Sequence, residues 1–428
     1  MNKTKILELV RQYEDEKFNK EKPFRPGIDR VPVSGAVIFP NDIVSVVDTA
    51  LDSWFTEWKV ANRFTKELEK WLGVNHAILT NSGSSATLIA LSALKEYYKI
   101  PNGAKVVTSP LEFPTTISAI IKVGLVPLFV DINIATLSVN TDDCIYILKY
   151  NKEVKGIVLS HVLGFPYRAD IIREELSINS RQFFLEDICD AIGAKINGEN
   201  VGTFGNVSTL SMFPAHHFTA GEGGACFTDV EQLKVLMDSY RSWGRACWCL
   251  PGQQNTCGKR FEHEWENLPK GWDHKYTFSR LGYNLKMTEL QAALGLSQLS
   301  HLDDFIDKRR YNFYYLKKAL KDIEQISTVF IPSWSEPSPF GFPIIVSQGN
   351  AQELIRFLQE KKIDTRPVFA GNITRHPMMK DVKYEIFNNL KDADFVMNNV
   401  FWIGCHPGLT EKHLDYVSEC FHEFYKGK

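Results

Sequence analysis

Short apolar runs alternate along the chain with longer segments in which apolar residues recur every three or four positions. The runs have the length of buried strands, and segments such as WKVANRFTKELEKWLGV have the spacing of one helix face. The expected strands are His76–Thr80, Lys105–Ser109, Leu125–Ile132, Gly156–Pro166, Phe183–Asp190 and Val207–Met212. Strands that alternate with helices through about residue 240 predict an α/β fold, with a mainly parallel sheet between helices.

The C-terminal part repeats this alternation on a smaller scale. A helix through Leu316 and Leu320 leads to the strand segments ISTVFIP and PFGFPIIV and to the helical segment AQELIRFLQEKK. We therefore expect a small C-terminal α/β domain that follows a larger domain. The predicted divisions are an N-terminal segment, 1–50, that packs on the C-terminal domain, a large domain, 51–298, with a loop at 244–272, and the small domain, 299–428.

Charge and composition narrow the class of protein without identifying it. The 428 residues include 49 Lys and Arg against 51 Asp and Glu, a formal net charge of −2, and they form no basic stripe for nucleic acid. No run of about 20 apolar residues predicts a membrane span, and the charged residues of MNKTKILELVRQYEDEKF predict an amphipathic helix rather than a signal peptide. We expect a soluble, cytoplasmic protein whose eight cysteines are reduced or metal-bound.

Two segments at the ends of expected strands carry candidate chemistry. LEDICDAIGA, 185–194, ends a strand with acidic residues. SMFPAHHFTAGEGGACF, 211–227, leaves a strand through a turn at Pro214, followed by His216, His217 and a glycine-dense stretch. A glycine turn after a strand is by itself a common connection. Ligands of parallel α/β sheets bind beyond the carboxyl ends of the strands, which is where both segments fall.

Together the two segments resemble the DegT/DnrJ/EryC1/StrS family of sugar aminotransferases, which use pyridoxal phosphate. The resemblance covers nearly the whole chain and implies a type I aminotransferase-like fold. It places Asp187 under the pyridine nitrogen of the cofactor, Asp190 near the ring hydroxyl and Ser211 against the cofactor. Most of the aminotransferases have Gln or His at the position of Asp190, whereas the related dehydrases have Asp.

His216 stands where the aminotransferases carry the lysine that binds the cofactor covalently. Histidine cannot replace that covalent link, but it is a good general acid and base near neutral pH. The chain therefore resembles the lysine-less branch of the family, the 3-dehydrases of nucleotide-linked 4-keto-6-deoxy sugars, which hold pyridoxamine phosphate non-covalently. The alternative is an inactive relative in which His216 is only a packed side chain.

Further cofactor contacts follow from the same resemblance. Gly83 and Ser84, at the start of an expected helix, would hold the cofactor phosphate. Taken in isolation the segment would favour a plain serine N-cap, but the downstream resemblance outweighs that interpretation. Phe113 would stack on the pyridine ring, or it is simply a packed loop residue. Asn284, in GYNLKMTELQAALG, would reach the cofactor phosphate of a partner subunit, which implies a homodimer with shared active sites.

Four cysteines have the spacing C-x57-C-x-C-x7-C, at Cys189, Cys247, Cys249 and Cys257. This spacing resembles the [2Fe–2S] motif of the CDP-4-keto-6-deoxyglucose 3-dehydrases. Four thiolates also suit a structural zinc ion. Asp187 and Cys189 lie about 7 Å apart if the chain between them is extended, so a metal on Cys189 would stand beside the cofactor ring. That position favours an electron-transfer cluster.

The resemblance implies the C3-deoxygenation of a nucleotide-linked 4-keto-6-deoxyhexose, with CDP-6-deoxy-4-hexulose as the expected substrate, in dideoxyhexose and O-antigen biosynthesis. An NADH-dependent flavin reductase would supply the electrons. The loop IDTRPVFAGNITRHP, with Arg366, Asn372, Arg375 and His376, is expected to face sugar or nucleotide phosphate, or else to be a solvated basic loop. Three alternatives stay open: a cluster-free 3-dehydratase recharged by glutamate, a sugar aminotransferase, and a zinc-stapled binding protein.

Overall fold

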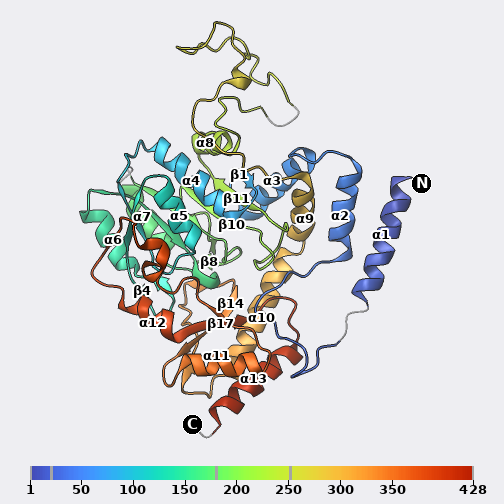
Figure 1. Ribbon diagram of the computed structural model, residues 1–428, viewed down its shortest axis with the longest axis vertical. Coiled ribbons are helices and arrows are strands. Elements are labelled where there is room, and N and C mark those ends of the chain that lie inside the picture. Colours follow the sequence, from blue (N-terminus) through green and yellow to red (C-terminus); the bar gives the residue numbers. More distant parts are fainter. Residues whose placement is uncertain (1, 20–22, 179–181, 250–252, 427–428) are drawn as a thin grey trace.

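An eight-stranded sheet forms the centre of the molecule in the computed structural model, which describes residues 2–19, 23–178, 182–249 and 253–426 (Figure 1). The strand order is β1–β11–β10–β7–β6–β2–β3–β16, and only the two pairs made by β11 are antiparallel. The bounds are β1 His76–Thr80, β11 Gly224–Thr228, β10 Val207–Ser211, β7 Phe183–Asp187, β6 Val154–Ser160, β2 Lys105–Thr108, β3 Val126–Phe129 and β16 Glu385–Ile386. The predicted mainly parallel sheet is confirmed.

Both faces of this sheet are buried against helices. Along β7, Phe183 and Leu185 belong to one apolar cluster, whereas Phe184, which points to the opposite face, belongs to another. A strand buried on both faces is a continuous apolar run in the sequence, which is the pattern that predicted these strands. Helices α4 Gly83–Tyr97, α5 Pro114–Lys122 and α8 Glu231–Arg241 cover the first face, and α3 Lys59–Leu72, α6 Thr141–Tyr150, α7 Ala169–Ile178 and α9 Glu289–Leu299 cover the second.

A smaller lobe follows the connecting helix α10, Leu302–Ala319. Its antiparallel sheet has the order β12–β14–β17–β15. The bounds are β12 Ile326–Ser327, β14 Gly341–Val346, β17 Val400–Gly404 and β15 Arg366–Pro367, with helices α11 Ala351–Glu360, α12 Lys391–Asn399 and α13 Glu411–Tyr425. The first apolar cluster continues into this lobe through Phe342 and Phe401, so the two lobes share a core.

Short elements connect these layers. Two small sheets, β13–β8–β9 and β4–β5, lie outside the two larger ones. Their strands are β4 Ile132–Asn133, β5 Ser138–Val139, β8 Lys195–Ile196, β9 Glu199–Asn200 and β13 Ser335–Glu336, and the 3-10 turns are η1 Val162–Gly164, η2 His274–Tyr276, η3 Ile373–Arg375 and η4 Pro377–Met379. Among the described residues, no helix is both long and apolar enough to cross a membrane.

The N-terminal segment divides its contacts between the two lobes. Helix α1, Lys3–Phe18, packs against α2, Pro40–Leu51, and α2 packs against α9 of the large lobe. The connector between them contacts the small lobe instead, since Phe24 stacks on His413 with ring centroids 3.9 Å apart. The domain boundaries predicted from the sequence stay a prediction.

The segment after α8 projects away from both lobes and has little regular structure (Figure 1). Isolated bridges join its two ends, one between Ser242 and Asn284 and one between Arg245 and Phe278. Residues 250–252 of the predicted loop 244–272 lie outside the described residues. Its other residues include three of the four cysteines in the predicted cluster motif.

Candidate active site

A cavity of about 630 Å³ lies beyond the carboxyl ends of the central strands, where the large sheet meets the small lobe. Strands β6, β7 and β10 end at it, helices α4 and α5 begin at it, and β15 and β17 close it from the small lobe. Eight of the predicted site residues line this cavity: Gly83, Ser84, Phe113, Asp187, Cys189, Asp190, Ser211 and His216. Asn284 and the cysteines of the projecting loop do not.

Asp187 ends β7 and is 5% exposed. Its Oδ1 accepts a hydrogen bond from the backbone N–H of Cys189 at 3.0 Å, and its Oδ2 a long one from the Thr116 hydroxyl at 3.4 Å. Burial raises the pKa of this carboxyl, and no Lys or Arg of the described residues pairs with it. A cationic N–H donor from a ligand would offset that loss of hydration. A protonated pyridine nitrogen has this chemistry.

His216 lies beside Asp190, with 3.3 Å between Nδ1 and Asp190 Oδ1. The two atoms are close, yet their orientation does not make a hydrogen bond, and both Nδ1 and Asp190 Oδ2 are buried without a partner among the described residues. A hydrogen bond weakens steeply when it is bent, so the two groups are close without being bonded to each other. The pair therefore offers an acid–base group and an acceptor that a ligand in the cavity could engage.

Arg309 on α10 holds the backbone of the turn that carries His216. Its guanidinium is fully buried and donates to the carbonyl oxygens of Ala215 at 3.3 Å, His216 at 2.9 Å and Phe340 at 2.9 Å. A buried guanidinium that donates to several carbonyls fixes the geometry of the loop that supplies them. Sequence reasoning missed Arg309, because nothing in its own helix marks it.

His217, next to His216, points away from the cavity into the protein. Its Nε2 lies 2.9 Å from the Ser338 hydroxyl and 3.1 Å from the Ser338 carbonyl oxygen, and the side chain is 2% exposed. Burial and the nearby Arg309 hold the pKa of His217 well below its usual range, so it stays neutral. Of the two adjacent histidines, only His216 is placed to act on a ligand.

Helix α4 begins at the cavity wall. Ser82 is its N-cap and its hydroxyl accepts from the Ser85 backbone N–H at 3.2 Å, while the Ser84 hydroxyl donates to Thr115 Oγ1 at 2.8 Å. A Cβ on Gly83 would stand 2.5 Å from the Cβ of Ser211, so only glycine fits there. Free backbone N–H groups at such a helix start are suited to a phosphate.

The opposite wall is aromatic and basic. Phe113, half exposed, meets Phe369 edge to face with ring centroids 5.9 Å apart, and Arg366 lies on the same wall. Phe113 lines the cavity and half of its surface is exposed, which is compatible with stacking on a flat ring. Phe369, from the small lobe, had no signal in the sequence.

The predicted phosphate-facing loop is corrected in part. Arg366 lines the cavity, but Arg375 pairs with Asp394 at 2.6 Å, and the fully buried Asn372 donates to the same carboxylate at 2.8 Å. His376 lies 2.8 Å from the carbonyl oxygen of Ala370. These three side chains stabilise the loop internally, because Asp394 on α12 binds Asn372 and Arg375 and the Ala370 carbonyl oxygen contacts His376.

Glu112 is a buried carboxyl that sequence reasoning missed, although it directly precedes Phe113. It is fully buried, and one oxygen accepts from the Ser160 backbone N–H at 2.9 Å while the other contacts the Ser160 hydroxyl. Burial, with a smaller contribution from Asp187 and Asp190, raises its pKa to about 8. Glu112 is therefore protonated at neutral pH and places an uncharged donor behind the cavity wall.

The four cysteines of the motif are not gathered in one chain. Cys189 lines the cavity, and its Sγ lies 3.8 Å from the carbonyl oxygen of Thr209. In the loop, the Cys249 N–H donates to Cys247 Sγ and the Thr256 N–H donates to Cys249 Sγ, each at 3.4 Å. The loop cysteines are arranged near one another, and Cys189 does not join them in a group whose sulfurs all lie within 4.8 Å among the described residues.

Asn284 lies outside the cavity on the exposed side of the projecting segment. Its side-chain oxygen accepts from Lys286 Nζ at 2.7 Å. Large apolar side chains around it are open to solvent, among them Leu281, which is 94% exposed. In a single chain, Asn284 and these apolar side chains are therefore exposed to solvent.

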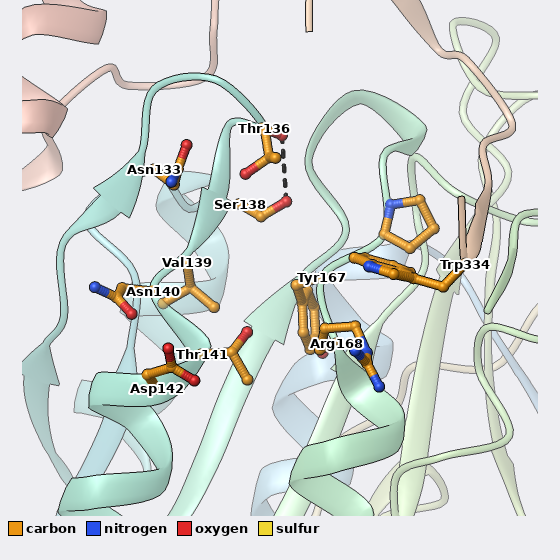
Figure 2. A pocket seen from close by; sticks show the side chains of 11 residues that line it. Asn133, Thr136, Ser138, Val139, Asn140, Thr141, Asp142, Tyr167, Arg168 and Trp334 are labelled. Atoms are coloured by element: carbon orange, nitrogen blue, oxygen red, sulfur yellow. Dashed lines mark hydrogen bonds between the residues drawn. The ribbon is translucent and has the colours of Figure 1, made fainter. Parts of the chain in front are cut away.

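A second hollow, of about 370 Å³, contains none of the predicted site residues (Figure 2). Tyr167, Arg168 and Trp334 lie together on one side of it, and Asn140 and Asp142 face them from the start of α6. Arg168 is already paired with Asp170 at 2.8 Å. The larger cavity is the better candidate, because it joins unpartnered acid–base groups with a helix start whose backbone N–H groups suit an anion.

Comparison with known proteins agrees with this geometry. The chain is 43% identical to the lipopolysaccharide biosynthesis protein RfbH of Salmonella typhimurium. The alignment of 428 residues covers 98% of this chain and 97% of that protein. It is 41% identical over 430 residues to dTDP-4-dehydro-2,6-dideoxy-D-glucose 3-dehydratase of Saccharopolyspora spinosa, over 99% of this chain and 92% of the relative.

The fold also matches solved structures. An E. coli GDP-4-keto-6-deoxy-D-mannose-3-dehydratase with bound hydrated PLP superposes with a TM-score of 0.82 at 25% identity, over 91% of this chain and 98% of that one. The predicted aminotransferase-like fold is thus confirmed. The profile of the DegT/DnrJ/EryC1/StrS aminotransferase family matches residues 39–422. The chain therefore belongs to the DegT/DnrJ/EryC1/StrS aminotransferase family.

Proposed function

We propose that the protein removes the C3 hydroxyl of a nucleotide-linked 4-keto-6-deoxyhexose, using non-covalently bound pyridoxamine phosphate. The observation that carries this proposal is His216 in the cavity, at the position where the aminotransferases of the family have lysine. Relatives named as nucleotide-sugar 3-dehydratases support it. CDP-6-deoxy-4-hexulose is the proposed substrate, in dideoxyhexose and O-antigen biosynthesis in the cytoplasm.

The cavity residues fit the cofactor. Pyridoxamine phosphate, when bound, supplies an amine for the C4 ketone of the sugar and a ring that takes up electron density. We assign the phosphate to the start of α4 at Gly83 and Ser84, and the ring nitrogen to Asp187. Phe113 would cover the ring, with Asp190 and Ser211 contacting it from the strand ends.

His216 would do the proton chemistry. It would remove a proton from the cofactor methylene and then protonate the C3 hydroxyl as it leaves as water. Two electrons and two protons complete the overall change, which converts the 4-keto-6-deoxyhexose into a 3,6-dideoxy-4-ketohexose and one water. An NADH-dependent flavin reductase is the proposed source of the electrons.

A [2Fe–2S] cluster on Cys189, Cys247, Cys249 and Cys257 belongs to the same proposal. The motif spacing supports it, and so do the N–H···S hydrogen bonds of the loop, because such bonds stabilise thiolates. Since one chain does not bring the four sulfurs together, we assign no reaction step to the cluster.

The main alternative is a cluster-free 3-dehydratase recharged by glutamate. A conventional aminotransferase is disfavoured, because no lysine of the described residues lines the cavity.

An anaerobic assay of the purified protein tests the proposal. With pyridoxamine phosphate and a panel of nucleotide-linked 4-keto sugars, we expect release of water from C3, with a preference for the CDP sugar. Turnover should then need either NADH with a flavin reductase or glutamate, and iron and acid-labile sulfide analysis separates the two schemes.

In the cluster scheme, Cys247→Ser should lose reductive turnover and keep dehydration. Transfer of an amine to C4 with C3 left intact would overturn the proposal.

A further inference from the structure

Three neighbouring strands of the large sheet end in polar side chains that line the active-site cavity. Ser211 ends β10, Asp187 ends β7 and Ser160 ends β6, and β7 lies between the other two strands. In the register of the sheet, Ser160 pairs directly with Asp187. A ligand whose ring nitrogen meets Asp187 therefore has Ser160 on one side of it and Ser211 on the other.

Glu112 contacts Ser160 through both of its carboxyl oxygens. The Ser160 backbone N–H donates to Oε1 at 2.9 Å, and the Ser160 hydroxyl contacts Oε2. Glu112 is fully buried, and no Lys, Arg or His of the described residues pairs with it. The charged groups that act on it are the carboxyls of Asp187 and Asp190, which disfavour a further negative charge. A buried carboxyl in such surroundings is neutral, in agreement with its pKa of about 8.

The neutral state of Glu112 sets the direction of its contact with Ser160. A protonated carboxyl has one O–H to donate, and its other oxygen accepts. Since Oε1 accepts the backbone N–H, the proton belongs on Oε2 and is donated to Ser160 Oγ. The serine proton is then free to point into the cavity. An ionised Glu112 would instead accept that proton, and Ser160 would offer a ligand only lone pairs.

The cofactor positions assigned above determine which edge of the ring faces β6. The phosphate is assigned to the start of α4, where Gly83 closely approaches Ser211 of β10, and the ring nitrogen to Asp187 of β7. In pyridoxamine phosphate, the phosphate arm and the ring hydroxyl stand on opposite sides of the ring nitrogen. With the phosphate on the β10 side, the ring hydroxyl lies on the side of β6 and Ser160.

We propose that Ser160 donates a hydrogen bond to the ring oxygen of pyridoxamine phosphate, and that Glu112 is the positioning residue that keeps Ser160 a donor. Asp190, which is assigned to the same oxygen, offers an acceptor. The ring oxygen would therefore donate to Asp190 and accept from Ser160. This inference rests on the proposed function, because it concerns the same cofactor in the same cavity.

Cofactor binding by the full-length protein tests the inference without any turnover. The probes are pyridoxamine phosphate and an analogue with hydrogen in place of the ring hydroxyl, and the fluorescence of the ring gives both dissociation constants. Ser160→Ala should weaken binding of pyridoxamine phosphate roughly three- to tenfold, the usual value of one hydrogen bond, and leave binding of the analogue unchanged. Equal changes for the two probes, or no change for either, would overturn the inference.

Two substitutions of Glu112 test its role through Ser160. Glu112→Gln keeps an oxygen for the Ser160 N–H and an N–H donor for the hydroxyl oxygen, so it should retain the wild-type preference for pyridoxamine phosphate over the analogue. Glu112→Ala removes both contacts and should lose most of that preference. Loss of the preference in Glu112→Gln would mean that Ser160 needs an ionised partner, and this would overturn the role of Glu112 even if Glu112→Ala does not fold.

Two controls separate this inference from the proposed function. Ser138→Ala removes a buried serine hydroxyl in the second hollow, outside the cavity, and should bind both probes like wild type (Figure 2). Wild-type protein that binds neither probe would overturn the proposed function and the inference together. Wild-type protein that binds both probes equally well would overturn the inference alone.

Discussion

In the proposed function, the side chain at residue 216 determines whether the cofactor is held covalently. Replacing His216 with Asn should leave pyridoxamine phosphate bound but slow C3 dehydration by roughly 10²–10⁴-fold, the usual contribution of one general acid–base group. His216→Lys should instead bind pyridoxal phosphate covalently, giving a yellow, borohydride-reducible protein that no longer dehydrates. Single-turnover rates and absorbance spectra measure both effects.

The neighbouring histidine is the matched control. His217 contacts Ser338 inside the protein, so His217→Asn should lower stability but retain most of the dehydration rate per folded molecule. Were His217→Asn the inactive variant and His216→Asn the active one, the alignment of the motif with the family would be wrong by one residue.

Glu112 should make the protein less stable as the pH rises. Its pKa is about 8 in the folded protein against 4.5 for an ordinary glutamate, so the folded state binds the proton more tightly than the unfolded state. The stabilisation is complete below about pH 4.5 and is lost as the pH rises toward 8. Glu112→Gln should remove this loss, on the order of 5 kcal/mol in the free energy of unfolding.

Denaturant titrations at several pH values between 5 and 9 measure this difference. Glu67→Gln changes an exposed glutamate in the same way and should leave the pH profile as it is in wild type. Parallel profiles for wild type and Glu112→Gln would show that Glu112 titrates normally.

At the scale of elements, the start of α4 depends on its close approach to the end of β10. A Cβ at residue 83 would meet Ser211 Cβ at 2.5 Å, so Gly83→Ala should push the helix start away from the strand. We expect a loss of about 1–3 kcal/mol of stability, the usual cost of overpacking. Affinity should fall for pyridoxamine phosphate but not for pyridoxamine, because only the phosphate binds the helix start.

A second substitution tests the cause. Gly83→Ala combined with Ser211→Gly removes the closest of the clashing atoms and should restore part of the stability and of the phosphate affinity. A double variant no better than the single one would locate the effect elsewhere, in the backbone of α4 rather than in its contact with β10.

The sequence patterns predicted the strands that are buried on both faces. β7 and its neighbours were recognisable because both faces of each strand are apolar, and their carboxyl ends carry Asp187 and Ser211 to one cavity. Contacts between distant segments had no local signal. Arg309 reaches the His216 turn from α10, and Asp394 takes the donors of Asn372 and Arg375, so neither role could be predicted from neighbouring residues.

At the scale of the whole molecule, the projecting segment exposes large apolar side chains, and we propose that a second copy of the chain covers them. Tyr276 and Phe278 are each 55% exposed and Leu281 is 94% exposed, all on the segment that carries Asn284. Large apolar side chains grouped on a surface usually mark an interface. In the proposed homodimer this surface would be covered, and Asn284 would enter the active site of the partner subunit.

Mixing two inactive variants tests this shared site. His216→Asn and Asn284→Ala each damage every site of their own dimers, since each site takes His216 from one chain and Asn284 from the other. After subunit exchange, about half of the dimers contain one chain of each kind, and one of their two sites is intact. The mixture should therefore recover about a quarter of the wild-type rate.

Mixing His216→Asn with Asp187→Asn is the control and should recover nothing, because both residues belong to the same chain's cavity. No recovery in the first mixture, with exchange verified by differently tagged chains, would mean that Asn284 does not serve the partner's site.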